Sequence, residues 1–304
     1  MSIIIAHGGA ETIIDDKHIN GLEIAALMGC MKLHDGDGCL EAVEAVINGL
    51  EDNPIFNAGY GSVLNRDGYV ETDASVMDGE TGKFGSVAAL KNIRHTISVA
   101  KKVIEETENV LLAGEGALKF AISNGFQIEE CITPAQMESW LKAIKIGFDG
   151  SDTRFSLSTG MPKGGDTVGC VLLDDMGNLA AGNSTGGLFM KRPGRVGDAP
   201  FIGGGIFASK YCSVVCTGTG EAFTRTLTAK YIDECIRDGL SPIDAGCKAI
   251  KRMFDITGKT GGVIILNCNG ESAAVHNCEC MPAVMMNSGK QAELEIVNCN
   301  SKIF

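Results

Sequence analysis

The stretch GGDTVG, residues 164–169, joins a polar, glycine-rich segment to the apolar run Val168–Leu173. A short apolar run that follows such a turn predicts a buried strand, with Thr167 at its mouth. If the Asp166–Thr167 peptide bond is cleaved, Thr167 carries both a hydroxyl nucleophile and a free α-amine. A threonine-type amidohydrolase requires those two groups. Taken alone, the stretch is more simply interpreted as a turn that feeds a strand.

Size and composition are those of a globular protein. The chain has 304 residues, of which 44% are hydrophobic and 21% charged, enough for one large α/β domain or two small ones. No apolar run reaches the length of a membrane span, and the opening MSIIIAHGG lacks the basic segment and long apolar stretch of a signal peptide. We therefore expect a cytoplasmic protein without a membrane partner. The net charge of −12 argues against nucleic acid as a partner.

The twelve cysteines do not form a compact disulfide framework. Several lie inside apolar patterns, such as Cys170 and Cys235, where a reduced thiol behaves as a small hydrophobic side chain. Cys278 and Cys280 are the only close pair, and no second pair stands at metal-site spacing. We therefore expect no zinc site.

Apolar periodicity predicts an alternation of strands and helices along the chain. The expected strands are Ile3–Ala6, Tyr69–Met77, Ser86–Leu90, Val168–Leu173, Leu179–Gly182, Ser213–Thr217, Gly262–Leu266 and Ser272–His276. The expected helices are Ile19–Leu33, Cys39–Leu50, Ile97–Glu106, Leu111–Ser123, Pro134–Ile144, Ala222–Asp238 and Pro242–Phe254. Residues 147–166 predict an exposed, mobile linker that tolerates cleavage. The order predicts a layered α/β sandwich with sheets in the middle, formed by one domain that spans the linker.

Three further motifs follow Thr167 within about fifty residues: STGG (184–187), GRVGDAP (194–200) and CTGTGE (216–221). STGG ends the strand next to the one that Thr167 opens. GRVGDAP offers a guanidinium and a carboxylate, which suit the α-carboxylate and α-ammonium of an amino acid. CTGTGE ends a strand and opens a helix, whose free N–H groups suit an anion.

Each motif also has a purely structural interpretation. GRVGDAP is typical of a surface turn with an internal ion pair between Arg195 and Asp198. CTGTGE is typical of helix capping, with Thr219 as the cap and Glu221 in the first turn. Only the occurrence of all of them in one order favours a catalytic site.

Together, DTVG, STGG, GRVGDAP and CTGTGE resemble the plant-type L-asparaginase/isoaspartyl peptidase family of N-terminal-nucleophile (Ntn) hydrolases. The first half of the chain agrees through HGGA (7–10), NPIFNAGYGSVLN (53–65) and ETDASVMDG (71–79). The resemblance covers nearly the whole chain. It implies a single domain with an αββα sandwich, cleaved between Asp166 and Thr167 into an α subunit (1–166) and a β subunit (167–304). It also implies a dimer of such units that hydrolyses L-asparagine and β-aspartyl dipeptides without a catalytic cofactor.

The resemblance assigns roles residue by residue. It makes Thr167 the nucleophile, with Thr185 supporting it. The remaining residues bind the substrate or stabilise the oxyanion: Arg195 holds the α-carboxylate, Asp198 holds the α-ammonium, the Thr217 hydroxyl and the Gly218 N–H form the oxyanion hole, and Gly220 contacts the substrate. A structural sodium ion is implied in the 50–60 loop, bound mostly by carbonyl oxygens of Leu50, Glu51, Asn53, Phe56, Ala58 and Tyr60.

The sequence departs from the family pattern at three places. Glu11 replaces a small residue near the nucleophile, Asp166 stands where glycine is usual, and HNCECM (276–281) differs from a Thr/Ser-rich form. Asp166 is similar to the residue found in glycosylasparaginase or the threonine aspartase taspase. A glycosylasparaginase-like amidase therefore remains an alternative, whereas taspase's long basic insertion is absent. An unprocessed, inactive relative with a binding role is the alternative from another class. A nucleotide-binding protein is disfavoured because the chain has no P-loop.

Overall fold

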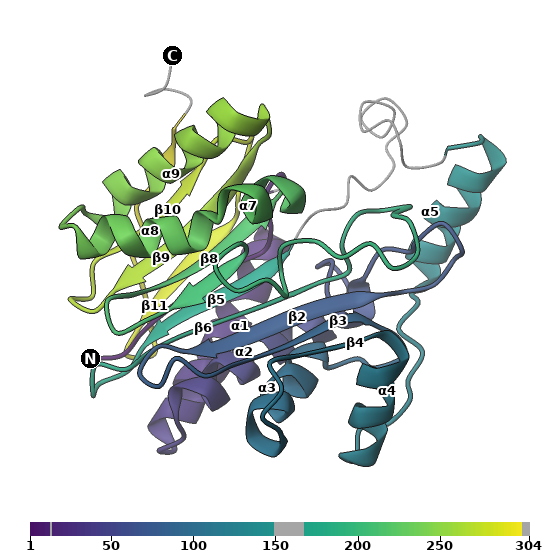
Figure 1. The fold of residues 1–304 in the computed structure, drawn as a ribbon, viewed down its shortest axis with the longest axis horizontal. Helices are drawn as coiled ribbons and strands as arrows, with labels where there is room; N and C mark the ends of the chain where they lie inside the picture. Colours follow the sequence, from purple (N-terminus) through teal and green to yellow (C-terminus); the bar gives the residue numbers. More distant parts are fainter. Residues whose placement is uncertain (13, 149–166, 300–304) are drawn as a thin grey trace.

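The structure is a computed structural model that describes residues 1–12, 14–148 and 167–299. The strand that begins directly after Thr167 lies in the interior of an eight-stranded sheet (Figure 1). Its strands lie in the order β12 (Lys290–Ala292), β11 (Ala283–Asn287), β1 (Ile3–His7), β5 (Val168–Leu173), β6 (Leu179–Thr185), β2 (Thr72–Asp78), β3 (Phe84–Leu90) and β4 (Leu111–Ala113). Neighbouring strands are antiparallel except β3 and β4. Asp166 and the rest of the predicted linker from residue 149 lie outside the described residues.

A second sheet of five strands packs against the first. Its order is β13 (Ile296–Asn298), β10 (Ser272–His276), β9 (Gly261–Asn267), β8 (Cys212–Gly218) and β7 (Ile206–Ala208). Apolar side chains from both sheets, including Ile5, Val171 and Ile264, form one buried cluster between them. The two sheets therefore share a core, and the described residues form a single compact α/β domain.

Strand β1 illustrates why the apolar runs predict buried strands. Ile3 and Ile5 point toward the second sheet, whereas Ile4 and Ala6 point toward the helices on the other face. Successive side chains of a strand point to opposite faces, so a strand covered on both faces is apolar at every position. The same holds for β5, all of which is buried.

Helices cover the outer face of each sheet (Figure 1). The larger sheet is covered by α1 (Asp16–His34), α2 (Cys39–Asp52), α3 (Thr96–Glu106) and α4 (Gly114–Ser123), and the smaller by α7 (Gly220–Thr226), α8 (Thr228–Arg237) and α9 (Pro242–Thr257). Helix α5 (Pro134–Lys145) lies at one end of the molecule. None of these helices, within the ranges described, combines the length and apolar character that a membrane span requires.

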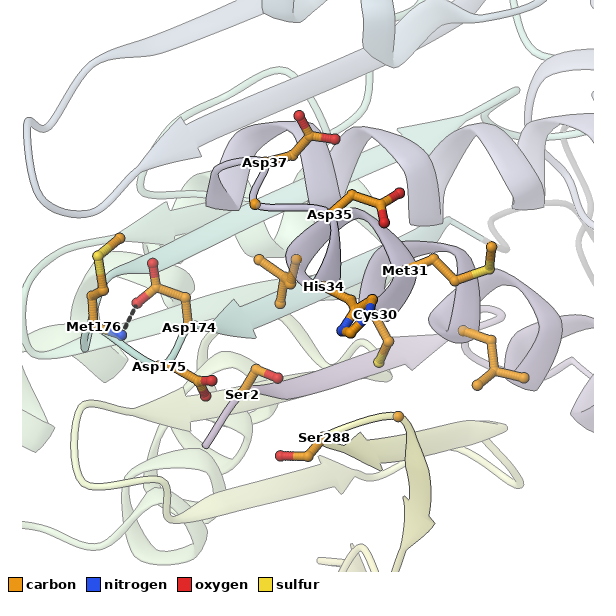
Figure 2. Close-up of a pocket in the computed structure, with 14 residues that line it drawn as sticks. Ser2, Cys30, Met31, His34, Asp35, Asp37, Asp174, Asp175, Met176 and Ser288 are labelled. Carbon is orange, nitrogen blue, oxygen red and sulfur yellow. Dashed lines mark hydrogen bonds between the residues drawn. The ribbon is translucent and has the colours of Figure 1, made fainter.

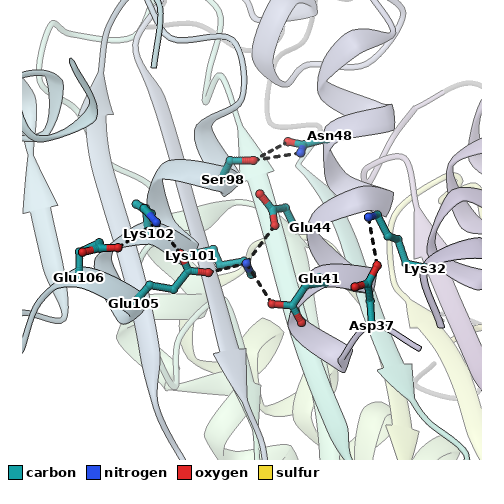
Figure 3. Close-up of polar contacts among 10 residues, drawn as sticks. All are labelled: Lys32, Asp37, Glu41, Glu44, Asn48, Ser98, Lys101, Lys102, Glu105 and Glu106. Atoms are coloured by element: carbon teal, nitrogen blue, oxygen red, sulfur yellow. Dashed lines mark hydrogen bonds and ion pairs between the residues drawn. The ribbon is translucent and has the colours of Figure 1, made fainter. Parts of the chain in front are cut away.

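An ion-pair network joins the outer helices α2 and α3 (Figure 3). Lys101 of α3 contacts Glu41 and Glu44 of α2 at 3.1 and 3.3 Å, and it also pairs with Glu105 on its own helix. These carboxylates hold the pKa of Lys101 above its usual value. Helix α2 packs behind β5 and β6, so the network helps to hold the layer that supports Thr167 and Thr185.

Three predicted elements were wrong in detail. The predicted helix Ala222–Asp238 is two helices, because Leu227 adopts the left-handed conformation (φ 47°) and interrupts it. The predicted helix Leu111–Ser123 begins with the edge strand β4, and α4 starts only at Gly114. The predicted strand Leu179–Gly182 was too short, since β6 continues to Thr185.

Candidate active site

Thr167 and Thr185 stand at the same end of two neighbouring strands. Val168 pairs with Ser184, and the antiparallel register therefore places Thr167 opposite Thr185 at that end. Both threonines are buried. The Thr185 hydroxyl oxygen accepts a hydrogen bond from the Gly187 N–H at 2.9 Å, so its own proton stays available for donation. The predicted neighbour relation of the two strands is confirmed.

Thr217 brings the second sheet to the same end. Its hydroxyl oxygen accepts a hydrogen bond from the Ala10 N–H at 3.0 Å, which joins the end of β8 to the chain that leaves β1. The hydroxyl proton can then be donated to a third group. Gly218 follows with φ 128°, and a Cβ there would lie 2.6 Å from the Gly261 Cα. Only glycine fits this position, where the strand bends into α7.

Arg195 and Asp198 do not form the internal ion pair of the surface-turn interpretation. Arg195 instead donates to the Glu221 carboxylate, from Nε at 2.9 Å and from Nη2 at 2.8 Å. Thr219 precedes α7 without accepting a side-chain capping bond, so the capping interpretation of CTGTGE is also wrong for that residue. The Glu221 carboxylate binds a guanidinium 26 residues away in the sequence.

Asp198 is a buried carboxylate whose hydrogen-bonding capacity is incompletely used. It is 4% exposed, and its Oδ2 has no hydrogen-bond partner among the residues that the structure describes. Burial raises its pKa to about 7, although the Arg195 charge opposes the effect. Gly205 and Gly220 pack directly on the carboxyl, since a Cβ on either would lie 2.8 Å from one of its oxygens. Gly220, predicted to contact substrate, lies at Asp198.

The loop that carries Arg195 is supported by three charged residues for which no role was predicted from the sequence. Glu71 accepts a hydrogen bond from the Gly194 N–H at 2.9 Å, and Asp73 accepts one from the Gly197 N–H at 3.4 Å. The buried Lys191 ammonium donates to the Glu71 carbonyl at 2.8 Å. Burial raises the pKa of Asp73 and lowers that of Lys191. Glu71 and Asp73 belong to the ETDASVMDG motif, which was the available signal.

His7 is a second residue without an assigned role. It is fully buried, and burial lowers its pKa to about 3, so the imidazole is neutral. The Thr167 backbone lies near the ring and opposes that shift only in part. Neither ring nitrogen has a hydrogen-bond partner of normal geometry among the described residues.

Glu11 follows Ala10, whose N–H donates to the Thr217 hydroxyl. It adopts a left-handed conformation (φ 64°), which is unfavourable for a non-glycine residue. Its carboxylate accepts a hydrogen bond from the Thr260 hydroxyl at 3.4 Å. Because Thr260 precedes the strand that pairs with Thr217 and Gly218, Glu11 is connected to the predicted oxyanion hole.

The 50–60 loop has a donor set that fits a hard cation. The carbonyl oxygens of Leu50, Asn53 and Ala58 each accept one backbone N–H, which leaves each a second lone pair. The Glu51 carboxyl accepts a hydrogen bond from the Ser184 hydroxyl at 2.6 Å, and burial raises its pKa to about 8. Within the described part of the chain, its Oε2 has no hydrogen-bond partner. The loop thus lies directly behind Thr185. No group of three or more His, Cys, Asp or Glu that could hold a metal occurs among the described residues.

A cavity of about 720 Å³ lies elsewhere, between the end of α1 and the turn after β5 (Figure 2). Its walls include Cys30, His34, Asp174 and Asp175. These residues lie at the far end of β5 from Thr167, and a six-residue strand spans roughly 20 Å. The cavity is therefore separate from the candidate active site.

Comparison with known proteins agrees with this arrangement. A family model described as asparaginase matches residues 1–296, a span that contains every predicted site residue. The chain belongs to the asparaginase family. It is therefore a hydrolase. It is 40% identical to a plant-type L-asparaginase of Thermococcus kodakarensis over 300 residues, covering 95% of this chain and 97% of that protein.

Other relatives carry a different name. The chain is 40% identical to an isoaspartyl peptidase of Salmonella typhimurium over 293 residues, covering 92% of this chain and 93% of the relative. It is 35% identical to an isoaspartyl peptidase/L-asparaginase of Rattus norvegicus over 310 residues, covering 99% of this chain and 90% of the relative.

Proposed function

We propose that this asparaginase-family chain is a threonine-dependent amidohydrolase that converts L-asparagine and β-aspartyl dipeptides to L-aspartate. The observation that carries the proposal is the buried Asp198 carboxylate, whose Oδ2 has no described partner, on the same short loop as the Arg195 guanidinium. A cation and an anion held a few residues apart suit the α-carboxylate and α-ammonium that every β-aspartyl substrate carries. The names of the relatives support the same substrates.

Self-cleavage comes first in the proposed mechanism. The Thr167 hydroxyl attacks the Asp166 carbonyl carbon, the C–N bond breaks, and the acyl group moves from nitrogen to oxygen as the amine takes up a proton. Water then hydrolyses the ester and frees residues 1–166. Thr167 keeps its hydroxyl and gains an α-amine with a reference pKa near ~8, which can act as a base at neutral pH.

Substrate hydrolysis repeats this chemistry on an external amide. The Thr167 amine takes the hydroxyl proton, and the oxygen attacks the side-chain carbonyl of the substrate. The Thr217 hydroxyl proton and the Gly218 N–H stabilise the oxyanion, each worth on the order of 3 kcal/mol. Ammonia or the amino acid leaves with a proton, and water releases aspartate from the ester. Thr185, opposite Thr167, orients the nucleophile.

The architecture supports this assignment. We propose that the two packed sheets with their outer helices are the αββα sandwich of the Ntn hydrolases, divided by cleavage into α and β subunits that form a dimer. We further propose that the 50–60 loop holds a sodium ion, which carbonyl oxygens of the loop behind Thr185 would coordinate in place of water. Cytoplasmic location stays a prediction.

The test is a comparison of three substrates with the protein after incubation at neutral pH: L-asparagine, a β-aspartyl dipeptide and a glycosylated asparagine. The proposal predicts release of aspartate from the first two. Turnover of the glycosylated substrate alone would favour the glycosylasparaginase-like alternative, and no turnover of any would favour the inactive relative.

A further inference from the structure

The guanidinium of Arg195 offers two separate forks of N–H donors, and the described residues occupy one of them. Nε and Nη2 together bind the Glu221 carboxylate at 2.9 and 2.8 Å, which occupies the side-on fork. The end-on fork, made by Nη1 and the second hydrogen of Nη2, remains available for another carboxylate. One guanidinium can therefore bind Glu221 and a substrate at the same time.

The available fork faces the candidate active site. A Cβ on Gly187 would lie 3.3 Å from Nη1, and a Cβ on Gly197 would lie 3.0 Å from it. Gly187 is two residues after Thr185 and donates its N–H to that hydroxyl. Because both residues are glycines, neither places a side chain against Nη1 near the end of the strand that carries Thr185.

Glu221 is the partner that orients the guanidinium. The backbone of the Arg195 loop is held separately, by Glu71 and Asp73, but those contacts do not reach the arginine side chain. The hydrogen bonds of that side chain to described residues all go to Glu221. The Arg195 side chain is 16% exposed and Glu221 is 55% exposed, so the pair lies at the surface of the site. A long arginine without this partner samples several rotamers.

We propose that Glu221 is a positioning residue for substrate recognition: it holds the Arg195 guanidinium side-on so that the end-on fork receives the α-carboxylate of a β-aspartyl substrate. The inference rests on the proposed function, since it concerns the same substrate. Glu221 should therefore affect the binding of substrate and not the cleavage of its amide bond. Self-cleavage involves no α-carboxylate, so it should not depend on Glu221.

The experiment is a double-mutant cycle of Glu221→Ala and Arg195→Ala, with Glu221→Gln as a variant of matched size. Glu115→Ala, which removes an exposed partner of Lys119, serves as the control. For each variant we would measure the extent of self-cleavage by mass, and kcat and KM for L-asparagine. Glu221→Ala should raise KM at least tenfold while kcat stays within about threefold, with full self-cleavage. Glu221→Gln, which keeps one acceptor oxygen, should lie between wild type and Glu221→Ala.

The cycle distinguishes positioning from a structural role. If Glu221 acts through Arg195, Glu221→Ala should lower kcat/KM no further once Arg195 is alanine. An equal additional loss in that background, or an unchanged KM in both Glu221 variants, would overturn the inference. A wild-type enzyme that self-cleaves but hydrolyses neither asparagine nor a β-aspartyl dipeptide would instead overturn the proposed function.

Discussion

Replacing Asp198 with asparagine should weaken substrate binding and, at alkaline pH, stabilise the folded protein. The carboxyl is 4% exposed, one of its oxygens has no hydrogen-bond partner in residues 1–12, 14–148 and 167–299, and burial raises its pKa to about 7. Above that pH the folded protein carries a buried negative charge, which a backbone N–H and the nearby Arg195 guanidinium offset in part. An asparagine has nearly the same shape and carries no charge, so it avoids the free-energy cost of burying a negative charge.

The magnitude follows from the pKa. The ordinary value is 3.8, so folding raises the pKa by about 3 units. The folded state binds the proton more tightly than the unfolded state, and the free energy of unfolding therefore falls as pH rises from about 4 to about 7. At about 1.4 kcal/mol per unit, the cost reaches ~4 kcal/mol at pH 8 and ~2 kcal/mol at pH 5. At roughly 2 °C per kcal/mol for a chain of this size, Asp198→Asn should raise Tm by several degrees at pH 8 and about half as much at pH 5.

Thermal unfolding at the two pH values would test this, with Asp255→Asn as the control. Asp255 is 54% exposed and pairs with Lys251 on the surface, so its replacement should change Tm little at either pH. Losing a hydrogen bond to a charged group costs about 1.5–3 kcal/mol, so kcat/KM for asparagine should fall roughly 10- to 100-fold. If Asp198→Asn has a lower Tm than the wild type at pH 8, or the same change in Tm at both pH values, the reasoning that Asp198 is a buried charge is refuted. Unchanged kcat/KM would refute the contact with the α-ammonium.

Three other predictions concern neighbouring groups. Arg195→Ala should raise KM steeply and leave self-cleavage intact, because the α-carboxylate belongs only to substrate; an equal loss of self-cleavage would contradict that role. Thr217→Val should lower kcat by about 10²–10³ and Thr217→Ser much less, because serine keeps the donor and the acceptor for the Ala10 N–H; equal rates for both would exclude the hydroxyl from the oxyanion hole. Tm should be higher in sodium chloride than in choline chloride at equal ionic strength if the 50–60 loop binds sodium, and equal values would argue against that ion.

Local sequence patterns were sufficient for the centre of the fold. The strands that begin at Val168 and Leu179 open with apolar runs and are separated by a short turn, so their pairing and the meeting of Thr167 with Thr185 could be predicted. Short edge strands such as β7 and β12 carry three residues each, too few for a periodic signal. The interruption at Leu227 also gave no signal, because leucine ordinarily favours a continuous helix.

Functional residues could be predicted where one short motif contains them. Hydrogen-bond partners from distant parts of the sequence could not be predicted. Arg195 and Asp198 belong to one short loop, so an ion pair between them was the simplest local interpretation. The structure pairs Arg195 with Glu221 and buries Asp198 with one oxygen that no described residue contacts by a hydrogen bond. Both results depend on the packing of β8 and α7 against the loop, which sequence spacing does not contain.

Intact mass and N-terminal sequencing after incubation at neutral pH test the central claim most directly, with Thr167→Ala as the matched variant. The account predicts two fragments of 166 and 138 residues in the wild type, with the new terminus Thr-Val-Gly-Cys, and a folded, uncut, inactive Thr167→Ala chain. A wild-type protein that stays one stable chain while it hydrolyses asparagine, or a Thr167→Ala protein that is cut or active, would contradict it.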